Sequence, residues 1–346
     1  MEDNGDMLDA TELLDRVYPL SSLPRTLLGF NNVTIREAVK QCDLLIARIP
    51  SFAAYKAFHF AQRYGKKTLS VAIACAWDSS WNHSLFGKLI SPYLTLGMKN
   101  VAGKTDYMIY VTSSFLQKRY PCRCESIGVS DVNIQNALKE LTEERKQRYS
   151  DWNREIVLAT TGAVDNPTKG HQYVIRAIPL LEKENIRVKY KLIGGGNRTR
   201  LTAIAKKAGV SDKIVFTGRL TPEQVMEELD RTDIYIQPSL QEGLPRAVVE
   251  ALSRGCLAIG ARTGGIPELI DDPWTFEPKS EKEAAQTILR LIQEKNPEQM
   301  AECNLEKAKM FEKDRLQVLR DQYFQKIISS FFFGTAGTLL NDKDRF

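Results

Sequence analysis

The sequence predicts an α/β fold made of two Rossmann-like domains. Short apolar segments of strand length alternate with amphipathic segments of helix length along most of the chain. Glycine-rich turns follow several of the expected strands in the second half, which is typical of doubly wound nucleotide-binding sheets. A length of 346 residues also corresponds to about two domains.

The first half contains apolar and helical segments that alternate as in a parallel sheet with crossover helices. Strands are expected at 43–49, 67–76 and 107–112, and helices at 52–64 and 85–100. A polar, charge-rich helix at 133–153 is expected to connect this domain to the next one. The first domain is therefore assigned to residues 1–153.

The second half shows the alternation more clearly. Strands are expected at 155–160, 188–193, 214–217, 233–237 and 256–261, with helices at 171–184, 199–208, 222–230 and 245–254. Further helices are expected at 280–294 and 304–330. We assign the second domain to residues 154–304, and we expect the last helix, in residues 305–346, to return to the first domain before a C-terminal tail.

Composition excludes several classes of protein. With 43% hydrophobic and 26% charged residues the chain is typical of a soluble globular protein, and no apolar run reaches the ~18 residues of a membrane-spanning helix. The acidic, polar start is unlike a secretory signal, so a cytoplasmic location is expected. Six cysteines without a CxxC pair and three histidines without ligand spacing argue against a bound metal.

Charge is unevenly distributed along the chain. Residues 31–123 contain 13 lysines and arginines but only 4 acidic residues. Such a segment can face nucleic acid, anionic lipid or a phosphorylated substrate, or it can be an ordinary solvated surface. No RNA-binding signature supports nucleic acid, so no nucleic-acid partner is expected.

Two glutamates in the second half form the strongest motif, Glu242-Gly-Leu-Pro-Arg-Ala-Val-Val-Glu250. Glu242 follows an expected strand, so it lies near the carboxyl edge of the sheet, where open α/β folds bind ligands. Glu250 lies one helical turn after Arg246, and the first N–H groups of that helix form an anion site. Two carboxylates that flank an anion site suit a nucleotide sugar. On spacing alone, however, surface charge and a helix cap are the more frequent explanation.

Further motifs accompany this one in a fixed order. They are Lys169-Gly170, Leu192-Ile-Gly-Gly-Gly196, Val215-Phe-Thr-Gly-Arg-Leu220, Gln237-Pro-Ser-Leu-Gln-Glu-Gly-Leu-Pro245 and Gly264-Gly-Ile-Pro-Glu268. Over residues 155–270 the sequence thereby resembles the family 4 glycosyltransferases, also called glycosyl transferases group 1. These are retaining, metal-independent enzymes of the GT-B fold, in which two Rossmann-like domains face a cleft. The resemblance implies a nucleoside-diphosphate sugar as donor substrate and neither a cofactor nor a metal ion.

The resemblance also implies roles for individual residues. Glu242 matches the glutamate that hydrogen-bonds the donor sugar, Glu250 the one that accepts from the ribose hydroxyls, and Lys169 the lysine that neutralises the diphosphate. In the family the leaving diphosphate helps to deprotonate the acceptor on the same face of the sugar. The other expected donor-binding residues are Gly243, Leu244, Pro245, Arg246, Leu220, Gly218, Gly170 and Gly195.

One departure from the family concerns positive charge. The family has an arginine after the glycine that closes the first strand of this domain, but Gly162 is followed by Ala163. We hypothesise that Arg246 supplies the missing charge; the alternative is that it only pairs with Glu250 at the surface.

The first half resembles bacterial capsular and surface-polysaccharide glycosyltransferases in Asp43-Leu-Leu-Ile-Ala-Arg-Ile-Pro-Ser51, Trp77-Asp-Ser-Ser-Trp-Asn-His83 and Val111-Thr-Ser-Ser-Phe-Leu-Gln-Lys-Arg-Tyr-Pro121. The resemblance implies a polar residue in the first domain that faces the transferred sugar, and the candidates are His83 and Asp78. His83 is predicted to be catalytic together with Glu242 and Lys169. The strand and glycine-rich loop that open the family's first domain have no counterpart in residues 1–30, so this domain is expected to be shortened.

The expected activity is transfer of a sugar, with retention, to a growing cell-surface polysaccharide or lipid-linked glycan. Residues 86–99 mix apolar and basic residues, which is consistent with peripheral contact to an anionic membrane at the inner face of the plasma membrane. Pro92 argues against one long interfacial helix, and ordinary packing of this segment in the core is the alternative. The alternatives are a non-catalytic binder of nucleotide sugars or glycans and a sugar-nucleotide epimerase. The base, the sugar, the acceptor, the linkage and the oligomeric state do not follow from these motifs.

Overall fold

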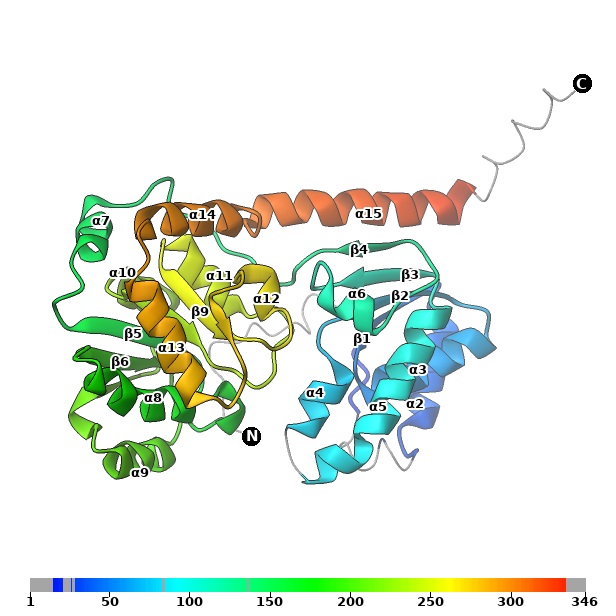
Figure 1. The fold of residues 1–346 in the computed structure, drawn as a ribbon. Helices are drawn as coiled ribbons and strands as arrows, with labels where there is room; N and C mark the ends of the chain where they lie inside the picture. The colour runs from blue at the N-terminus through cyan, green and yellow to red at the C-terminus, as the bar shows by residue number, and fades with distance from the viewer. Residues whose placement is uncertain (1–14, 21–25, 27–28, 83–84, 136, 334–346) are drawn as a thin grey trace, which may run out of the picture.

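The computed structural model describes residues 15–20, 26, 29–82, 85–135 and 137–333. Within these residues the strands form two separate parallel sheets, one of four strands and one of six. Figure 1 shows the two α/β units side by side, with the long helix α15 (Lys313–Phe333) running from the second unit across the first. This architecture confirms the predicted α/β fold with parallel sheets.

The first sheet has the strand order β1-β2-β3-β4, and all its pairs are parallel. Because successive strands are also neighbours, right-handed crossovers place their helices on one face of this sheet. The elements are α2 (Asn32–Gln41), β1 (Leu44–Ile49), α3 (Phe52–Arg63), β2 (Lys67–Ala72), α4 (Ala76–Trp81), α5 (Leu85–Lys104), β3 (Tyr107–Tyr110), α6 (Phe115–Arg119) and β4 (Ser126–Gly128).

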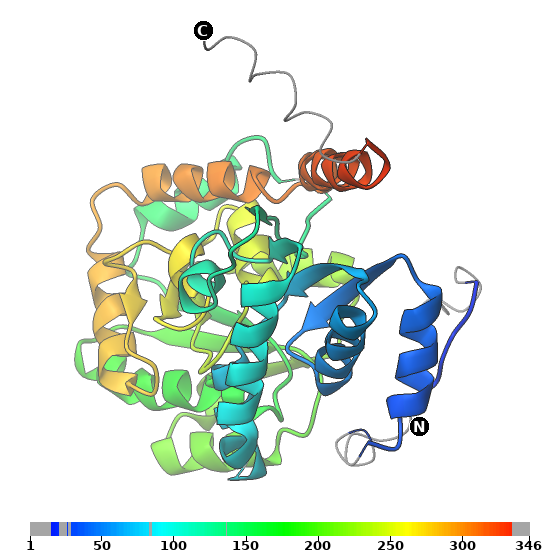
Figure 2. The same cartoon turned by 90° about the vertical axis from the view of Figure 1, so that its right-hand side faces the viewer.

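Helix α15 covers the other face of the first sheet. Its Leu316, Tyr323 and Ile327 are buried in one cluster with Leu69 and Ile109 of the strands. The Tyr323 hydroxyl accepts a hydrogen bond from the backbone N–H of Met108 at 3.2 Å. The C-terminal helix therefore completes the core of the N-terminal sheet. Figure 2 shows the same helix from the side, lying above the first unit.

The second sheet has the order β10-β9-β8-β5-β6-β7 and is wound in both directions from its centre. The chain first adds β6 and β7 on one side of β5 and then adds β8, β9 and β10 on the other, so the topological switch point lies between β5 and β8. The elements are α7 (Glu143–Ser150), β5 (Ile156–Thr161), the 3-10 helix η2 (Pro167–Lys169), α8 (His171–Lys183), β6 (Val188–Ile193), α9 (Thr199–Ala208), η3 (Ser211–Lys213), β7 (Ile214–Gly218), α10 (Pro222–Asp230), β8 (Ile234–Gln237), α11 (Arg246–Ser253), β9 (Leu257–Ala261), α12 (Ile266–Leu269), β10 (Thr275–Phe276), α13 (Glu281–Ile292) and α14 (Pro297–Lys309).

A buried arginine ties α7 to this second unit. The guanidinium of Arg145 donates to the carbonyls of Thr232 at 2.6 Å and Leu229 at 2.8 Å. Its neighbour on the same helix, Tyr149, is buried in the core around the second sheet. The helix expected to connect the domains is thus packed against the second one.

Two expected helices are wrong in extent. The connecting helix expected at 133–153 is helical only from Glu143 to Ser150, because Thr142 caps its start and the preceding residues form other contacts: the N–H of Leu138 donates to the carbonyl of Ser253. The helix expected at 304–330 is two helices, α14 and α15, and the turn between them brings the N–H of Lys313 to the carbonyl of Ile134.

Three other expectations in the first unit need correction. Pro92 does not divide α5, because it lies on the exposed side of the helix, where water can satisfy the carbonyl that loses its partner. The strand expected at 67–76 ends at Ala72, and Cys75 then caps α4. Helix α2, which the pattern did not predict, packs its Ile35 and Val39 against α3.

Candidate functional site

The loop between β8 and α11 places Glu242 at the switch point of the second sheet. The ammonium group of Lys169, at the end of η2, lies 2.8 Å from the Glu242 carboxylate. These two residues are 73 positions apart in the sequence, and the sheet brings them together because β5 and β8 are neighbours. The predicted pair therefore meets at the carboxyl edge, where open α/β sheets bind ligands.

A buried hydrogen-bond chain holds the Glu242 carboxylate. The amide nitrogen of Gln237 donates to Glu242 at 3.1 Å and to the Ser239 hydroxyl at 2.8 Å. The amide oxygen of Gln237 accepts from the Tyr235 hydroxyl at 2.7 Å. Gln237 and Tyr235 are fully buried, so this side of Glu242 is fixed in one orientation by the strand beneath it.

Close backbone contacts fix the position of Lys169. Gly170 has φ of +75°, and a Cβ at this position would lie only 1.9 Å from the carbonyl oxygen of Pro238. The side chain of Lys169 passes over Gly162, where a Cβ would come within 3.3 Å of it. Glycine is required at position 170 both by the backbone conformation and by the lack of space.

Glu250 and Arg246 lie on α11 and line the same cavity as the first pair. Burial raises the pKa of the Glu250 carboxyl above its ordinary value, and the positive charge of Arg246 offsets only part of this increase. The Arg246 side chain is exposed, and no hydrogen bond or ion pair joins it to Glu250 among the described residues. Arg246 is therefore available to a ligand in the cavity.

This cavity has a volume of about 430 Å³ and lies between the two units. The second unit contributes Thr161, Lys169, Gln237, residues 242–247 and Glu250, while the first unit contributes Ile73, Asp131 and Val132. Gly243 touches the opposite unit so closely that a Cβ would lie 2.6 Å from the carbonyl oxygen of Ile73. The cavity mixes two cations with three carboxylates, a composition suited to a ligand that carries both phosphates and hydroxyls.

A second cavity, of about 530 Å³, follows along the carboxyl ends of β5, β6 and β7. The predicted residues Leu220 and Gly195 line it, together with Ala163 and Arg219, and Thr161 lines both cavities. Gly218 ends β7 beside it with φ of +77°. Because Thr161 lines both cavities, they adjoin one another along the carboxyl edge of the second sheet.

A third, smaller cavity of about 170 Å³ adjoins Lys169 and Glu242 on the side of the first unit. Asp78 and Ser79 of α4 line it opposite Asn166 and Gln241. Asp78 forms an ion pair with Arg119 at 3.4 Å. Of the two candidates for the polar residue of the first domain, Asp78 lies at this cavity, whereas His83 lies outside the described residues.

Glu268 connects the two units at the edge of the cleft. Its carboxylate accepts hydrogen bonds from the backbone N–H groups of Ser113, Ser114 and Phe115 at 2.6, 3.0 and 2.6 Å, and from the Ser113 hydroxyl at 2.7 Å. Burial alone would raise the pKa of Glu268, but these hydrogen bonds outweigh it and the net pKa is lowered. The preceding Gly264 and Gly265 pack directly against the backbone of residues 242 and 243.

Several site residues were not predicted from the sequence. Ile73 and Asp131 follow β2 and β4, and only the packing of one unit on the other brings them to Glu242. The one signal that could have indicated them is their place just after expected or short strands, because ligands gather at that edge. Among the described residues, no group of three histidine, cysteine, aspartate or glutamate side chains is placed to hold a metal ion.

Comparisons with known proteins show which kinds of protein this chain is similar to. Residues 142–309 match the family of glycosyl transferases group 1, which supports a transferase. CapJ of Staphylococcus aureus is 28% identical over 336 residues, covering 95% of this chain and 83% of CapJ. The amylovoran biosynthesis glycosyltransferase AmsK of Erwinia amylovora is 29% identical over 135 residues, covering 36% of this chain and 33% of AmsK.

The fold also matches solved structures. The crystal structure of HepE from Anabaena in complex with UDP superposes with a TM-score of 0.65 at 16% identity, covering 89% of this chain and 84% of the HepE chain. This likeness confirms the expected GT-B arrangement of two α/β domains. No helix within the described residues is both long enough and apolar enough to cross a membrane.

Proposed function

We propose that this protein is a retaining hexosyltransferase that moves a sugar from a nucleoside-diphosphate sugar to a growing cell-surface polysaccharide or lipid-linked glycan, without a metal ion. The observation that carries the proposal is the meeting of Lys169, Glu242, Arg246 and Glu250 around one cavity at the switch point of the second sheet. The match to glycosyl transferases group 1 and the printed functions of relatives such as AmsK support the reaction class.

The donor diphosphate would lie between Lys169 and the first turn of α11. The first N–H groups of a helix have no acceptor within the helix, so they favour an anion, and Lys169 adds a positive charge. In the free protein Lys169 is paired with Glu242. A bound diphosphate would therefore share the lysine with Glu242, which accepts hydrogen bonds from the sugar hydroxyls.

In this reaction the bond between the sugar and the diphosphate breaks, and the new bond to the acceptor oxygen forms on the same face. The acceptor proton passes to the departing diphosphate. Charge develops on the diphosphate as it leaves, so preorganised cations beside it lower the barrier. Lys169 is the first such cation, and Arg246, exposed at the mouth of the cavity, is the second in place of the arginine that Ala163 replaces.

The base would occupy the second cavity, where Leu220 would pack against it beside Gly195 and Gly218. The ribose would lie in the first cavity, where Glu250 would accept hydrogen bonds from its hydroxyls. Asp78 in the third cavity would face the transferred sugar or its acceptor.

Thermal unfolding with UDP, GDP and ADP tests the donor site. A ligand at 100 times its dissociation constant stabilises a protein by about 2.7 kcal/mol, a readable shift. We expect one diphosphate to stabilise the wild type, Glu250→Ala to lose this response, and Glu302→Ala, an exposed residue of α14, to keep it. If no nucleoside diphosphate stabilises the protein, the proposed function is wrong.

Turnover separates the transferase from the two alternatives. A transferase releases nucleoside diphosphate only when an acceptor glycan is added, a non-catalytic binder releases none, and an epimerase converts the donor without acceptor. Arg246→Ala should weaken both donor affinity and turnover, since a second cation is removed from the diphosphate. If the variant keeps both, Arg246 is not the replacement for the missing arginine.

We also propose that α5 contacts an anionic membrane, which would bring the cleft to a lipid-linked acceptor. Its outer side exposes a stripe of apolar residues at helical spacing, and Leu85 and Leu89 are 83% and 78% exposed. The remaining members of the stripe are Phe86, Tyr93 and Leu96, flanked by the exposed Lys88 and Lys99.

Sedimentation with vesicles tests this contact. The protein should pellet at low salt with vesicles that contain phosphatidylglycerol and not with phosphatidylcholine alone, because lysines and apolar residues act together. Leu89→Asp should abolish pelleting, whereas Val318→Asp, an equally polar change on the exposed side of α15, should not. If the wild type stays in the supernatant, the membrane contact is ruled out.

A further inference from the structure

The third cavity has few free hydrogen-bond donors. Two hydroxyl groups in its lining already donate within the protein: Thr168 donates to the Asn166 amide oxygen at 2.8 Å, and Ser79 donates to a backbone carbonyl of α4 at 3.4 Å. The ammonium group of Lys169 is paired with Glu242. The polar groups that stay open to a ligand in this cavity are therefore mainly acceptors.

Gln241 contributes one such acceptor. Its side chain lines the third cavity, and its amide oxygen Oε1 is buried but accepts no hydrogen bond in the part of the chain that the structure describes. A buried acceptor without a donor destabilises a protein, and native structures keep few of them. A ligand in the cavity that donates a hydrogen bond would supply the missing partner.

The backbone on both sides of Gln241 is fixed. The N–H of Leu240 donates to a backbone carbonyl of η2 at 2.8 Å, and the Leu240 carbonyl accepts from the Asn82 amide of the first unit at 3.3 Å. On the other side, Gly264 packs so closely that a Cβ there would lie 2.0 Å from the carbonyl oxygen of Glu242. A shift of this loop would break these contacts, so Gln241 is held beside the cavity.

Two carboxylate oxygens complete the set of open acceptors. Glu242 accepts from both Lys169 and Gln237 through its oxygen Oε1, which leaves Oε2 without a donor among the described residues. On the side of the first unit, Asp78 forms its ion pair through Oδ1, and Oδ2 accepts no bond that the structure records. Acceptors from both units thus surround one small space. A ligand with several neutral donors, such as hydroxyl groups, fits this arrangement, whereas an anionic one is repelled.

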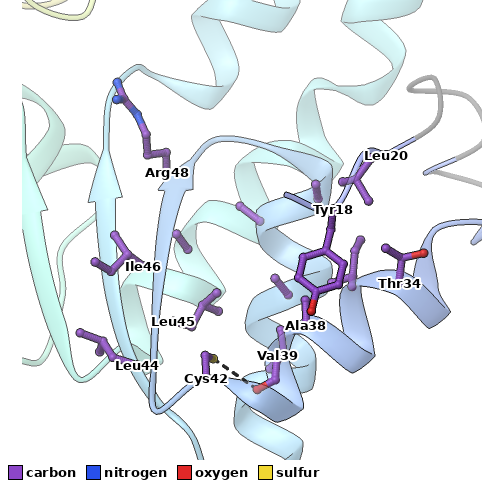
Figure 3. Close-up of a pocket in the computed structure, with 15 residues that line it drawn as sticks. Tyr18, Leu20, Thr34, Ala38, Val39, Cys42, Leu44, Leu45, Ile46 and Arg48 are labelled. Atoms are coloured by element: carbon purple, nitrogen blue, oxygen red, sulfur yellow. Dashed lines mark hydrogen bonds between the residues drawn. The ribbon is translucent and has the colours of Figure 1, made fainter. Parts of the chain in front are cut away.

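The larger cavity beside β1 shows the contrast. It has a volume of about 340 Å³, and its lining is mostly apolar, with Val39, Leu45 and Ile46 among the residues in Figure 3. A sugar would leave its hydroxyl groups without partners there, which is unfavourable. The chemistry of the third cavity, in contrast, matches a ligand rich in hydroxyls.

The third cavity adjoins the proposed place of the diphosphate. Lys169, Glu242 and Gly243 line both this cavity and the 430 Å³ cavity. In a nucleoside-diphosphate sugar the transferred sugar is bonded directly to the diphosphate. With the diphosphate beside Lys169, the transferred sugar is therefore the group that reaches the third cavity.

We propose that Gln241 is a specificity-determining residue, which accepts a hydrogen bond from one hydroxyl of the transferred sugar in the third cavity. This inference rests on the proposed function. Asp78 and Glu242 would accept from further hydroxyls, so the site selects a neutral sugar and rejects a uronic acid, whose carboxylate would face two others.

Isothermal titration calorimetry separates binding of the sugar from binding of the nucleotide. The probes are UDP-glucose, UDP-galactose, GDP-mannose and ADP-glucose, each measured beside its own nucleoside diphosphate. One of them should bind the wild type more tightly than its nucleoside diphosphate does. Gln241→Leu should bind that sugar nucleotide about tenfold more weakly and leave the affinity for the nucleoside diphosphate unchanged. Gln299→Leu, the same change at an exposed position of α14, should bind both like the wild type.

A hydroxyl contact has a signature that a merely structural residue lacks. In analogues of the same sugar nucleotide, fluorine replaces one hydroxyl at a time and cannot donate a hydrogen bond. The wild type should bind one analogue about tenfold more weakly than the parent, whereas Gln241→Leu should bind this analogue and the parent equally. The variant should also melt at the wild-type temperature or above it, because a buried acceptor without a donor has been removed.

Several results would overturn the proposal. They are a Gln241→Leu variant that keeps the wild-type preference for the hydroxyl, a variant that loses affinity for the nucleoside diphosphate as well, and UDP-glucuronic acid that binds the wild type more tightly than UDP. A wild type that binds a nucleoside diphosphate but no sugar nucleotide more tightly overturns this inference alone. A wild type that binds none of these nucleotides overturns the proposed function, and this inference with it.

Discussion

The interdomain contact of Glu268 makes a sharp prediction for the substitution Glu268→Gln. The carboxylate accepts three backbone N–H bonds at the start of α6 and one from the Ser113 hydroxyl, across the boundary between the two units. A glutamine keeps the shape but loses the charge, and its amide nitrogen faces N–H donors. Hydrogen bonds to a charged group contribute about 1.5–3 kcal/mol when buried, and this carboxylate is only half-buried, so we expect a loss of about 1–2 kcal/mol.

The pH dependence follows from the lowered pKa of Glu268. Its ordinary value is 4.5, and the folded value is lower. The contribution to stability is therefore fully present above pH 4.5 and is lost as the pH falls from there through the folded pKa. Denaturant unfolding should show a constant difference between wild type and Glu268→Gln from pH 8 to about pH 5, and a smaller difference in more acidic buffer.

Glu302→Gln is the matched control, since this glutamate is exposed on α14 and makes no hydrogen bond that the structure records. It should leave the free energy of unfolding unchanged throughout. The reasoning is refuted if Glu268→Gln unfolds like the wild type at pH 7, or if the difference between them grows on acidification.

Three further substitutions test the site and its support. Lys169→Ala should lower turnover at least ~100-fold with little change in the free energy of unfolding, because it removes a cation beside the leaving group; wild-type turnover would contradict the assigned role. Gly170→Ala should lower the free energy of unfolding by more than ~2 kcal/mol in a denaturant titration, because the new Cβ would meet the Pro238 carbonyl. Gly209→Ala is the control: its φ is nearly the same but its surroundings are open, so the free energy of unfolding should fall by only about 1 kcal/mol. Arg145→Ala should lower the free energy of unfolding by about 2–4 kcal/mol, because the buried carbonyls of Thr232 and Leu229 lose their donor. Arg145 lines none of the three cavities, so the nucleotide that binds should stay the same.

The elements of the second unit could largely be predicted because their periodicity is strong. Strands such as 188–193 are apolar, flanked by turn residues and long enough to be distinct. The first unit was harder: β4 has only three residues, none of them buried, and α6 has five, so neither leaves a period to detect. The Pro92 prediction failed because a proline weakens a helix without always ending it. On the exposed side of α5 water can satisfy the carbonyl that loses its partner, and the sequence does not state which side faces water.

Local sequence by itself determined the chemistry available to the site and its order along the chain. Lys169, Glu242 and Glu250 stand after strands or on the helix that follows, so their place at the carboxyl edge of one sheet follows from strand and helix alternation. Only the tertiary structure decided what faces them. The ion pair of Lys169 with Glu242, the approach of Ile73 to Gly243 and the place of β1 at the end of its described sheet depend on the order of the strands and on how the two sheets dock. These contacts join residues far apart in sequence, and no local pattern encodes the packing that brings them together.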